Sequence, residues 1–121
     1  IFLEKCGDAL GVESGEIKDA QLSASSSWRG IRAFGAQHAR LNNQQWPQGW
    51  SADVRDKNPW LKISLDVDHV ITGIATQGHG SLVFSERVES YFVVWLDIRA
   101  GKVYYHEDGK IKIEEHTSEL Q

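Results

Sequence analysis

Histidine, serine and acidic side chains are the residues of this 121-residue chain that could carry out chemistry. The turn Gly78-His79-Gly80-Ser81 superficially resembles a nucleophile turn, but such an elbow needs its serine between two glycines with a helix behind it. Neither His106 nor His116 belongs to a zinc-type histidine or cysteine cluster, and no phosphate-binding glycine loop is present. We therefore expect no catalytic residues and favour a binding protein over an enzyme.

Asp53 and Asp56 are the carboxylates that could hold a structural Ca²⁺ ion, because Ca²⁺ accepts carboxylate oxygens from loops. Their spacing is not diagnostic of a calcium site, and two solvated loop aspartates explain them better. We expect neither a metal site nor a cofactor.

Basic side chains are concentrated between residues 28 and 60, although the whole chain has a net charge of −4. The overall charge argues against a nucleic-acid partner. The local excess indicates either a basic binding rim or long side chains that solvate loops, and both interpretations remain open. The basic residues are Arg29, Arg32, Arg40, Arg55 and Lys57, against Asp53 and Asp56.

Apolar residues alternate with polar ones in the second half of the chain, which is typical of half-buried antiparallel strands. Strands are predicted over residues 60–67, 70–77 and 88–96, and a hairpin over 104–107 and 110–113 around Asp108-Gly109. The expected inward sets are Leu61, Ile63, Leu65 and Val67 in the first strand, and Val88, Phe92, Val94 and Leu96 in the third, where Val93 and Trp95 instead suggest burial on both faces.

The first half of the chain has no clear period and no helical pattern. Trp28, Phe34, Trp46 and Trp50 are scattered there among small and polar residues. Long loops of this kind are uncommon in compact domains and are often functional. Short strands with long aromatic loops at one end predict a single all-β domain, either a β-sandwich or a jelly-roll.

Six short motifs follow one another in a fixed order. They are residues 6–15 (CGDALGVESG), 22–27 (LSASSS), 39–42 (ARLN) with Trp50 behind it, 60–65 (WLKISL), 71–78 (ITGIATQG) and 88–91 (VESY). Each motif alone is weak, but in this order they resemble the discoidin family, also called the coagulation factor V/VIII type C domain. The resemblance runs to about Ile113 and covers about the first four-fifths of such a domain.

The resemblance implies a discoidin-like jelly-roll β-sandwich whose long loops, or spikes, project from one end. It also implies a non-catalytic role outside the cell, as part of a secreted protein or an ectodomain. Residues 1–121 are then one domain without its C-terminal strands. Cys6 is implied to form a disulfide whose partner is absent from this chain.

Family ligands include anionic phospholipid surfaces, glycans and proteins, and the fold does not choose among them. An aromatic ring beside a guanidinium suits a membrane interface, and it also suits a sugar or a protein. We rank anionic phospholipid slightly ahead. The candidate ligand-binding residues are Trp28, Arg29, Arg32 and Phe34 in the first loop, Trp46 in the second, and His79, Leu82, Val83 and Phe84 in the third.

Other interpretations of these residues stay open. Trp28 could be a satellite core residue, since large aromatic side chains are usually mostly buried. Residues 82–84 could belong to a strand. Trp50 is expected to pack in the core, whereas Trp46 has no counterpart in the family motif. A second function class is a structural or assembly subunit in which another chain completes the incomplete jelly-roll.

Overall fold

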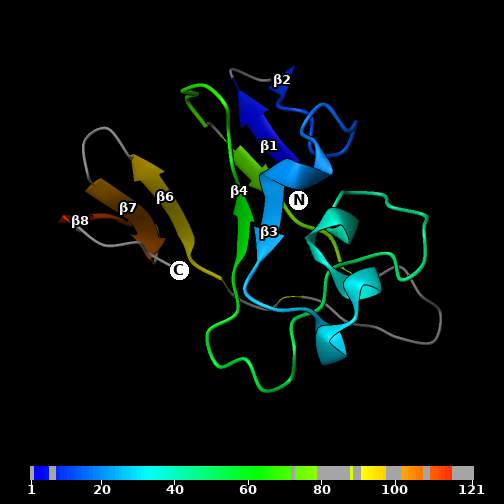
Figure 1. The fold of residues 1–121 in the computed structure, drawn as a ribbon. Coiled ribbons are helices and arrows are strands. Elements are labelled where there is room, and N and C mark those ends of the chain that lie inside the picture. The colour runs from blue at the N-terminus through cyan, green and yellow to red at the C-terminus, as the bar shows by residue number, and fades with distance from the viewer. Residues whose placement is uncertain are drawn as a thin grey trace. The chain divides into compact units, whose positions relative to one another are not determined.

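The computed structural model describes residues 2–5, 8–71, 73–78, 88, 91–97, 102–107 and 110–115. The chain divides into two compact units, Ile1–Arg87 and Val88–Gln121. Every strand pairing in the described residues is antiparallel, and their helices are short 3-10 turns (Figure 1). The all-β class is therefore confirmed, and the closed jelly-roll stays a prediction.

The first unit contains two small sheets and a series of 3-10 turns. One sheet has the order β2-β1-β5, and the other pairs β3 with β4. The strands are β1 Phe2–Lys5, β2 Asp8–Ala9, β3 Leu22–Ala24, β4 Leu61–Ile63 and β5 Gly73–Ala75. The turns are η1 Asp19–Gln21, η2 Trp28–Gly30, η3 Arg32–Phe34 and η4 Ala36–His38.

A small apolar core holds this unit together. Val12 is only 2% exposed, and it is buried with Ile17, Leu22 and Ala36. Half-buried residues pack against these four, among them Leu61 and Ile63 of β4 and Leu65 just after it, all from the predicted inward set. The alternation of apolar and polar residues around β4 thus correctly predicts which side chains face the core.

Two predicted strands are shorter than their apolar patterns. The strand predicted over 60–67 ends at Ile63, after which the Ser64 amide donates to the Gln21 carbonyl at 2.8 Å and the chain bends. Val67 is consequently 65% exposed, so its predicted inward position is wrong. The strand predicted over 70–77 is reduced to Gly73–Ala75, and Val70 before it is exposed.

The second unit contains one three-stranded sheet of order β6-β7-β8. Its strands are β6 Val93–Asp97, β7 Lys102–Glu107 and β8 Lys110–Glu115. The register Glu107↔Lys110 leaves a two-residue connection, which confirms the predicted hairpin.

The strand predicted over 88–96 starts only at Val93. Val88, Phe92 and Val94 are each more than half exposed, so the expected burial of this set is wrong for them. The described part of this unit is a single sheet, which provides no second layer for these side chains to pack against.

The turns η2 to η4 and the chain from residue 41 to 60 form long loops where β3 ends and β4 begins (Figure 1). This end of the strand pair is closed by two hydrogen bonds. The Ser25 amide donates to the Trp60 carbonyl at 2.9 Å, and the Trp60 amide donates to Ser25 Oγ at 2.9 Å. The β3–β4 pair therefore fixes where the first loop begins and where the second loop ends.

Candidate binding site on the long loops

Three aromatic rings from the two loops contact one another. The ring centroids of Trp28 and Phe34 are 5.0 Å apart, and those of Phe34 and Trp46 are 5.5 Å apart, both in edge-to-face geometry. The Arg29 guanidinium carbon lies 4.4 Å from the centre of the Trp28 ring. We call these four residues the aromatic-basic cluster.

Backbone hydrogen bonds hold the two loops against each other. The Trp28 amide donates to the Ser51 carbonyl at 2.7 Å, and the Ser51 amide donates to the Phe34 carbonyl at 3.3 Å. Trp50 is half-buried, and its indole N–H donates to the Ser26 carbonyl at 2.9 Å. The cluster is therefore positioned by main-chain contacts between loops and not only by its own rings.

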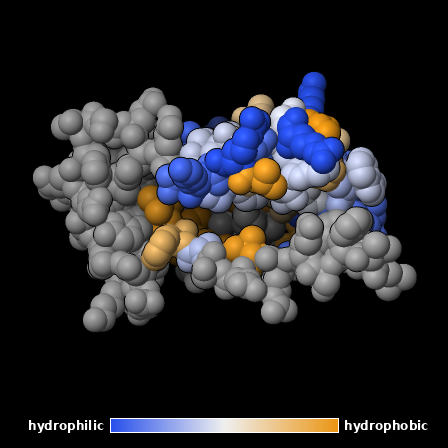
Figure 2. Space-filling view, turned by 90° about the horizontal axis from the view of Figure 1, so that it is seen from below, coloured by the Kyte–Doolittle hydropathy of each residue, from blue (hydrophilic) through white to orange (hydrophobic). Residues whose placement is uncertain are grey.

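The cluster is partly open to solvent. Trp46 is 75% exposed, Arg29 and the neighbouring Arg32 are exposed, and Ile31 between them is 41% exposed. Trp28 and Phe34 are half-buried. An exposed indole and exposed guanidinium groups suit an interface between an apolar and a charged medium. Elsewhere too the surface is mixed, since the face seen in Figure 2 carries hydrophilic residues directly beside hydrophobic ones.

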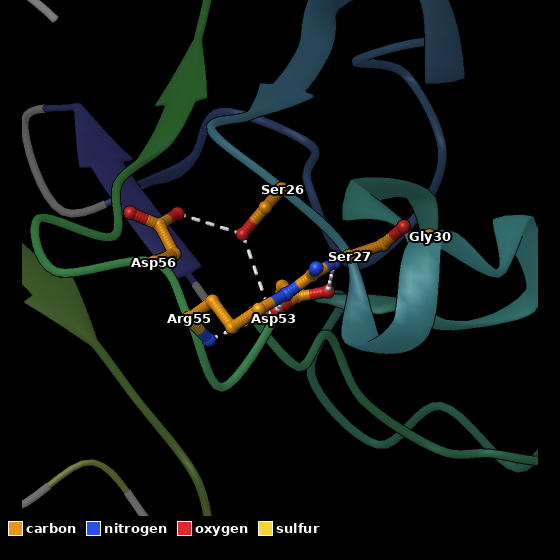
Figure 3. Close-up of a pocket in the computed structure, with 6 residues that line it drawn as sticks. All are labelled: Ser26, Ser27, Gly30, Asp53, Arg55 and Asp56. Atoms are coloured by element: carbon orange, nitrogen blue, oxygen red, sulfur yellow. Dashed lines mark hydrogen bonds and ion pairs between the residues drawn. The ribbon is translucent and has the colours of Figure 1, made fainter.

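A second feature is a shallow pocket of about 610 Å³ beside the first loop. Ser26, Ser27 and Gly30 line it together with Asp53, Arg55 and Asp56 (Figure 3). Its carboxylates are already engaged by protein donors. Asp56 accepts hydrogen bonds from the hydroxyls of Ser25 at 2.6 Å and Ser26 at 2.7 Å, and Asp53 accepts one from Arg55 Nε at 3.2 Å.

These hydrogen bonds stabilise the charged form of both aspartates. The hydroxyl of Ser25, and then that of Ser26, lowers the pKa of Asp56 below its ordinary value of 3.8. The Arg55 side chain lowers the pKa of Asp53 in the same direction. Across the described part of the chain, no three potential metal ligands come together. The Asp56 carboxylate joins the second loop to the residues that follow β3, whereas the Asp53 carboxylate contacts Arg55 of its own loop.

The lowered pKa of Asp56 gives a testable pH dependence. A carboxylate with a lowered pKa in the folded state stabilises the fold above its unfolded pKa, and that contribution is lost as the pH falls through the folded value. We expect wild-type stability to fall below about pH 4, and Asp56→Asn to be less stable at neutral pH but to lose less on acidification. Denaturant midpoints at several pH values measure this. Asp66→Asn, at an exposed bend, is the control; equal pH curves for wild type and Asp56→Asn would contradict the assignment.

The structure brings together four of the candidate residues from the sequence, namely Trp28, Arg29, Phe34 and Trp46. Arg32 lies exposed on η3, close to them in sequence. Trp46 is exposed and Trp50 is half-buried, but Trp50 bonds to the Ser26 carbonyl and is not among the described residues packed against the core, where the sequence predicts it. The remaining candidates, His79, Leu82, Val83, Phe84 and the disulfide residue Cys6, lie outside the described residues.

The sequence did not indicate that Arg40 bonds to a distant segment of the chain. Arg40 Nη1 donates to the carbonyls of Val12 and Ile17, and Nη2 donates to Asp19 Oδ1 at 2.6 Å. Its only signal in the sequence is its place in the ARLN motif. The partners lie more than twenty residues away, so no local pattern indicates them.

Curated relatives cover most of this chain. It is 35% identical to lactadherin of Mus musculus over 115 residues, which is 92% of this chain and 25% of the relative. It is 34% identical to the human EGF-like repeat and discoidin I-like domain-containing protein 3 over 88% of this chain and 21% of the relative. Bovine coagulation factor V is 40% identical over 76% of this chain and 4% of the relative.

The chain therefore spans about a quarter or less of the curated relatives it matches. No protein-family model matches it, and no solved structure matches it significantly. Within the described residues, no helix has the length and apolar character needed to cross a membrane.

Proposed function

Because the chain belongs to the discoidin family, we propose that its aromatic-basic cluster binds the surface of membranes that contain anionic phospholipids. The chain is an extracellular binding module, as its relatives indicate. What we propose beyond this is the identity of the ligand and of the residues that contact it. In this proposal the chain binds without catalysing a reaction.

The observation that carries the proposal is the exposed Trp46 ring, which is joined through Phe34 and Trp28 to the exposed Arg29 guanidinium. An indole is stabilised at headgroup depth because its body is apolar and its N–H is polar. Arginine forms charge-assisted hydrogen bonds with phosphate. Each basic residue near an anionic leaflet adds about 1 kcal/mol of attraction. The cluster contains both kinds of group, and both are exposed.

Binding to an anionic membrane needs both the exposed aromatic ring and the basic groups of the cluster. Exposed apolar area alone would favour any hydrophobic partner, and basic charge alone would favour any polyanion. The edge-to-face contacts join Trp46, through Phe34, to the Trp28–Arg29 pair, so the two kinds of group belong to one connected cluster.

Vesicle sedimentation tests the proposal. The protein is mixed with vesicles of pure phosphatidylcholine and with vesicles in which part of that lipid is replaced by phosphatidylserine. We expect binding to the anionic vesicles, weakened by added salt because surface attraction is screened, and little binding to the neutral ones. Equal binding to both, or to neither, would contradict an anionic membrane ligand and would favour a protein or glycan partner.

A further inference from the structure

Gln45 presents its side-chain carboxamide to solvent on the second long loop. The residue is exposed and lies between exposed Gln44 and Trp46, in a stretch without helix or strand. Its backbone is anchored, because its amide donates to Asn43 Oδ1 at 3.0 Å and its carbonyl accepts from the Gln48 amide at 2.6 Å. Its carboxamide makes no hydrogen bond with any residue that the structure describes. The loop thus holds the backbone of Gln45 and leaves the end of its side chain accessible.

The other glutamines in the described part of the chain differ from Gln45. Gln48 is half-buried. The immediate neighbour Gln44 is exposed, but its Nε2 donates to the Asn42 carbonyl at 3.2 Å. The glutamines whose carboxamides are used in hydrogen bonds within the chain are Gln21, Gln37, Gln44 and Gln77. Among the described glutamines, Gln45 therefore combines exposure with a carboxamide that the chain does not use.

The segment around Gln45 is uncharged. Residues 41–52 contain no acidic, basic or histidine side chain. A side chain that enters a narrow active site leaves its water behind, and charged neighbours would add a large desolvation cost. The exposed Trp46 ring next to it offers a partner protein an aromatic surface for contact. The Gln45 carboxamide can therefore enter the active site of an enzyme without the removal of neighbouring charges from water.

We propose that Gln45 is a site of enzymatic cross-linking, where a transglutaminase joins its carboxamide to a primary amine of another protein. The cysteine thiol of the enzyme attacks Gln45 Cδ, a thioester forms, and Nε2 leaves as ammonia. A lysine amine of the second protein then attacks the same carbon. This step forms an isopeptide bond and returns the thiol to the enzyme, and no atom is oxidised or reduced.

A cross-link at Gln45 would attach this extracellular chain covalently to a neighbouring protein. The attachment would persist whether or not the long loops remain bound to their ligand. This inference does not rest on the proposed membrane function, because the reaction needs the accessible carboxamide and no lipid.

Incorporation of the fluorescent amine dansylcadaverine tests the proposal. The protein is incubated with a calcium-activated transglutaminase in the absence of vesicles, and tandem mass spectrometry of its peptides locates the label. Gln45→Asn keeps the amide but shortens the side chain by one methylene. Gln44→Asn is the matched control at the exposed neighbour whose carboxamide is bonded. Circular dichroism verifies the fold of each variant, and dimethylcasein verifies that the enzyme is active.

We expect the label of the wild-type protein on Gln45. Gln45→Asn should incorporate the amine at least about tenfold more slowly, because misplacing a reacting atom by about 1 Å costs on the order of a hundredfold in rate. Gln44→Asn should be labelled as fast as wild type. Label on a different glutamine of the wild-type protein, or equal incorporation by Gln45→Asn and wild type, would overturn the inference. An unlabelled wild-type protein beside labelled dimethylcasein would overturn it as well.

Discussion

Replacing Trp46 by alanine is expected to weaken binding to phosphatidylserine vesicles about tenfold to hundredfold. The Trp46 side chain is 75% exposed in the free protein, so most of its apolar surface is available for transfer out of water. Withdrawing a large apolar side chain from water contributes about 1.5–3 kcal/mol, and 1.4 kcal/mol corresponds to a tenfold change in affinity. Titration of the protein with vesicles measures the loss.

The same substitution should have little effect on folding. The contact of Trp46 with the chain that the structure records is its edge-to-face packing on Phe34, worth about 0.5–1.5 kcal/mol. Val67→Ala is the matched control, because Val67 is also exposed but follows β4 at the opposite end of the β3–β4 pair (Figure 1). An affinity of Trp46→Ala within twofold of wild type, or an equal loss in Val67→Ala, would be incompatible with the proposed contact.

Replacing Arg40 by methionine is expected to reduce the free energy of unfolding by about 2–4 kcal/mol. Methionine keeps an unbranched apolar stem but removes the donors that satisfy the carbonyls of Val12 and Ile17. Hydrogen bonds from charged groups contribute about 1.5–3 kcal/mol, and buried acceptors left without partners add to the loss. Equilibrium unfolding in denaturant measures the difference between the two proteins.

The ion pair of Arg40 should account for only a small part of that loss. The Asp19 side chain is 72% exposed, whereas that of Arg40 is 16% exposed. Ion pairs with an exposed partner are typically worth about 1 kcal/mol or less. Asp19→Asn should therefore cost far less than Arg40→Met. Equal losses in the two variants would show that the ion pair, and not the two carbonyl contacts, carries the stabilising effect.

Local patterns in the sequence predict the elements that local interactions determine. The hairpin around residues 108 and 109 follows from a two-residue turn between alternating strands, and the register Glu107↔Lys110 agrees with it. Leu61, Ile63 and Leu65 face the core as their alternation indicates. Alternation fails to predict the exposure of Val67. The last hydrogen bond of this strand pair joins the Ser64 amide to the Gln21 carbonyl, and the chain bends after it.

The candidate site could be predicted only in part, because long-range contacts position its residues. Residue types and motif order identify Trp28, Arg29, Phe34 and Trp46 one at a time. Their mutual contacts depend on long-range hydrogen bonds, such as the one from Trp28 to Ser51, and on the left-handed backbone of Arg29. Neither has a periodic signature in the sequence. The hydrogen bonds from Arg40 to Val12 and Asp19 are also long-range, so no local pattern in the sequence predicts them.

The central claim is that the aromatic-basic cluster enters the headgroup region of an anionic membrane, and fluorescence quenching by brominated phospholipid tests it most directly. Bromine atoms placed on the acyl chains close to the headgroups quench a tryptophan only when its ring lies close to them. The protein and its Trp46→Phe variant are compared on vesicles that contain phosphatidylserine with and without brominated lipid. If Trp46 contacts the membrane as proposed, we expect strong quenching of the wild-type protein and a loss of most of that quenching in Trp46→Phe. Identical quenching of the two proteins, or none in either while both are bound, would contradict it.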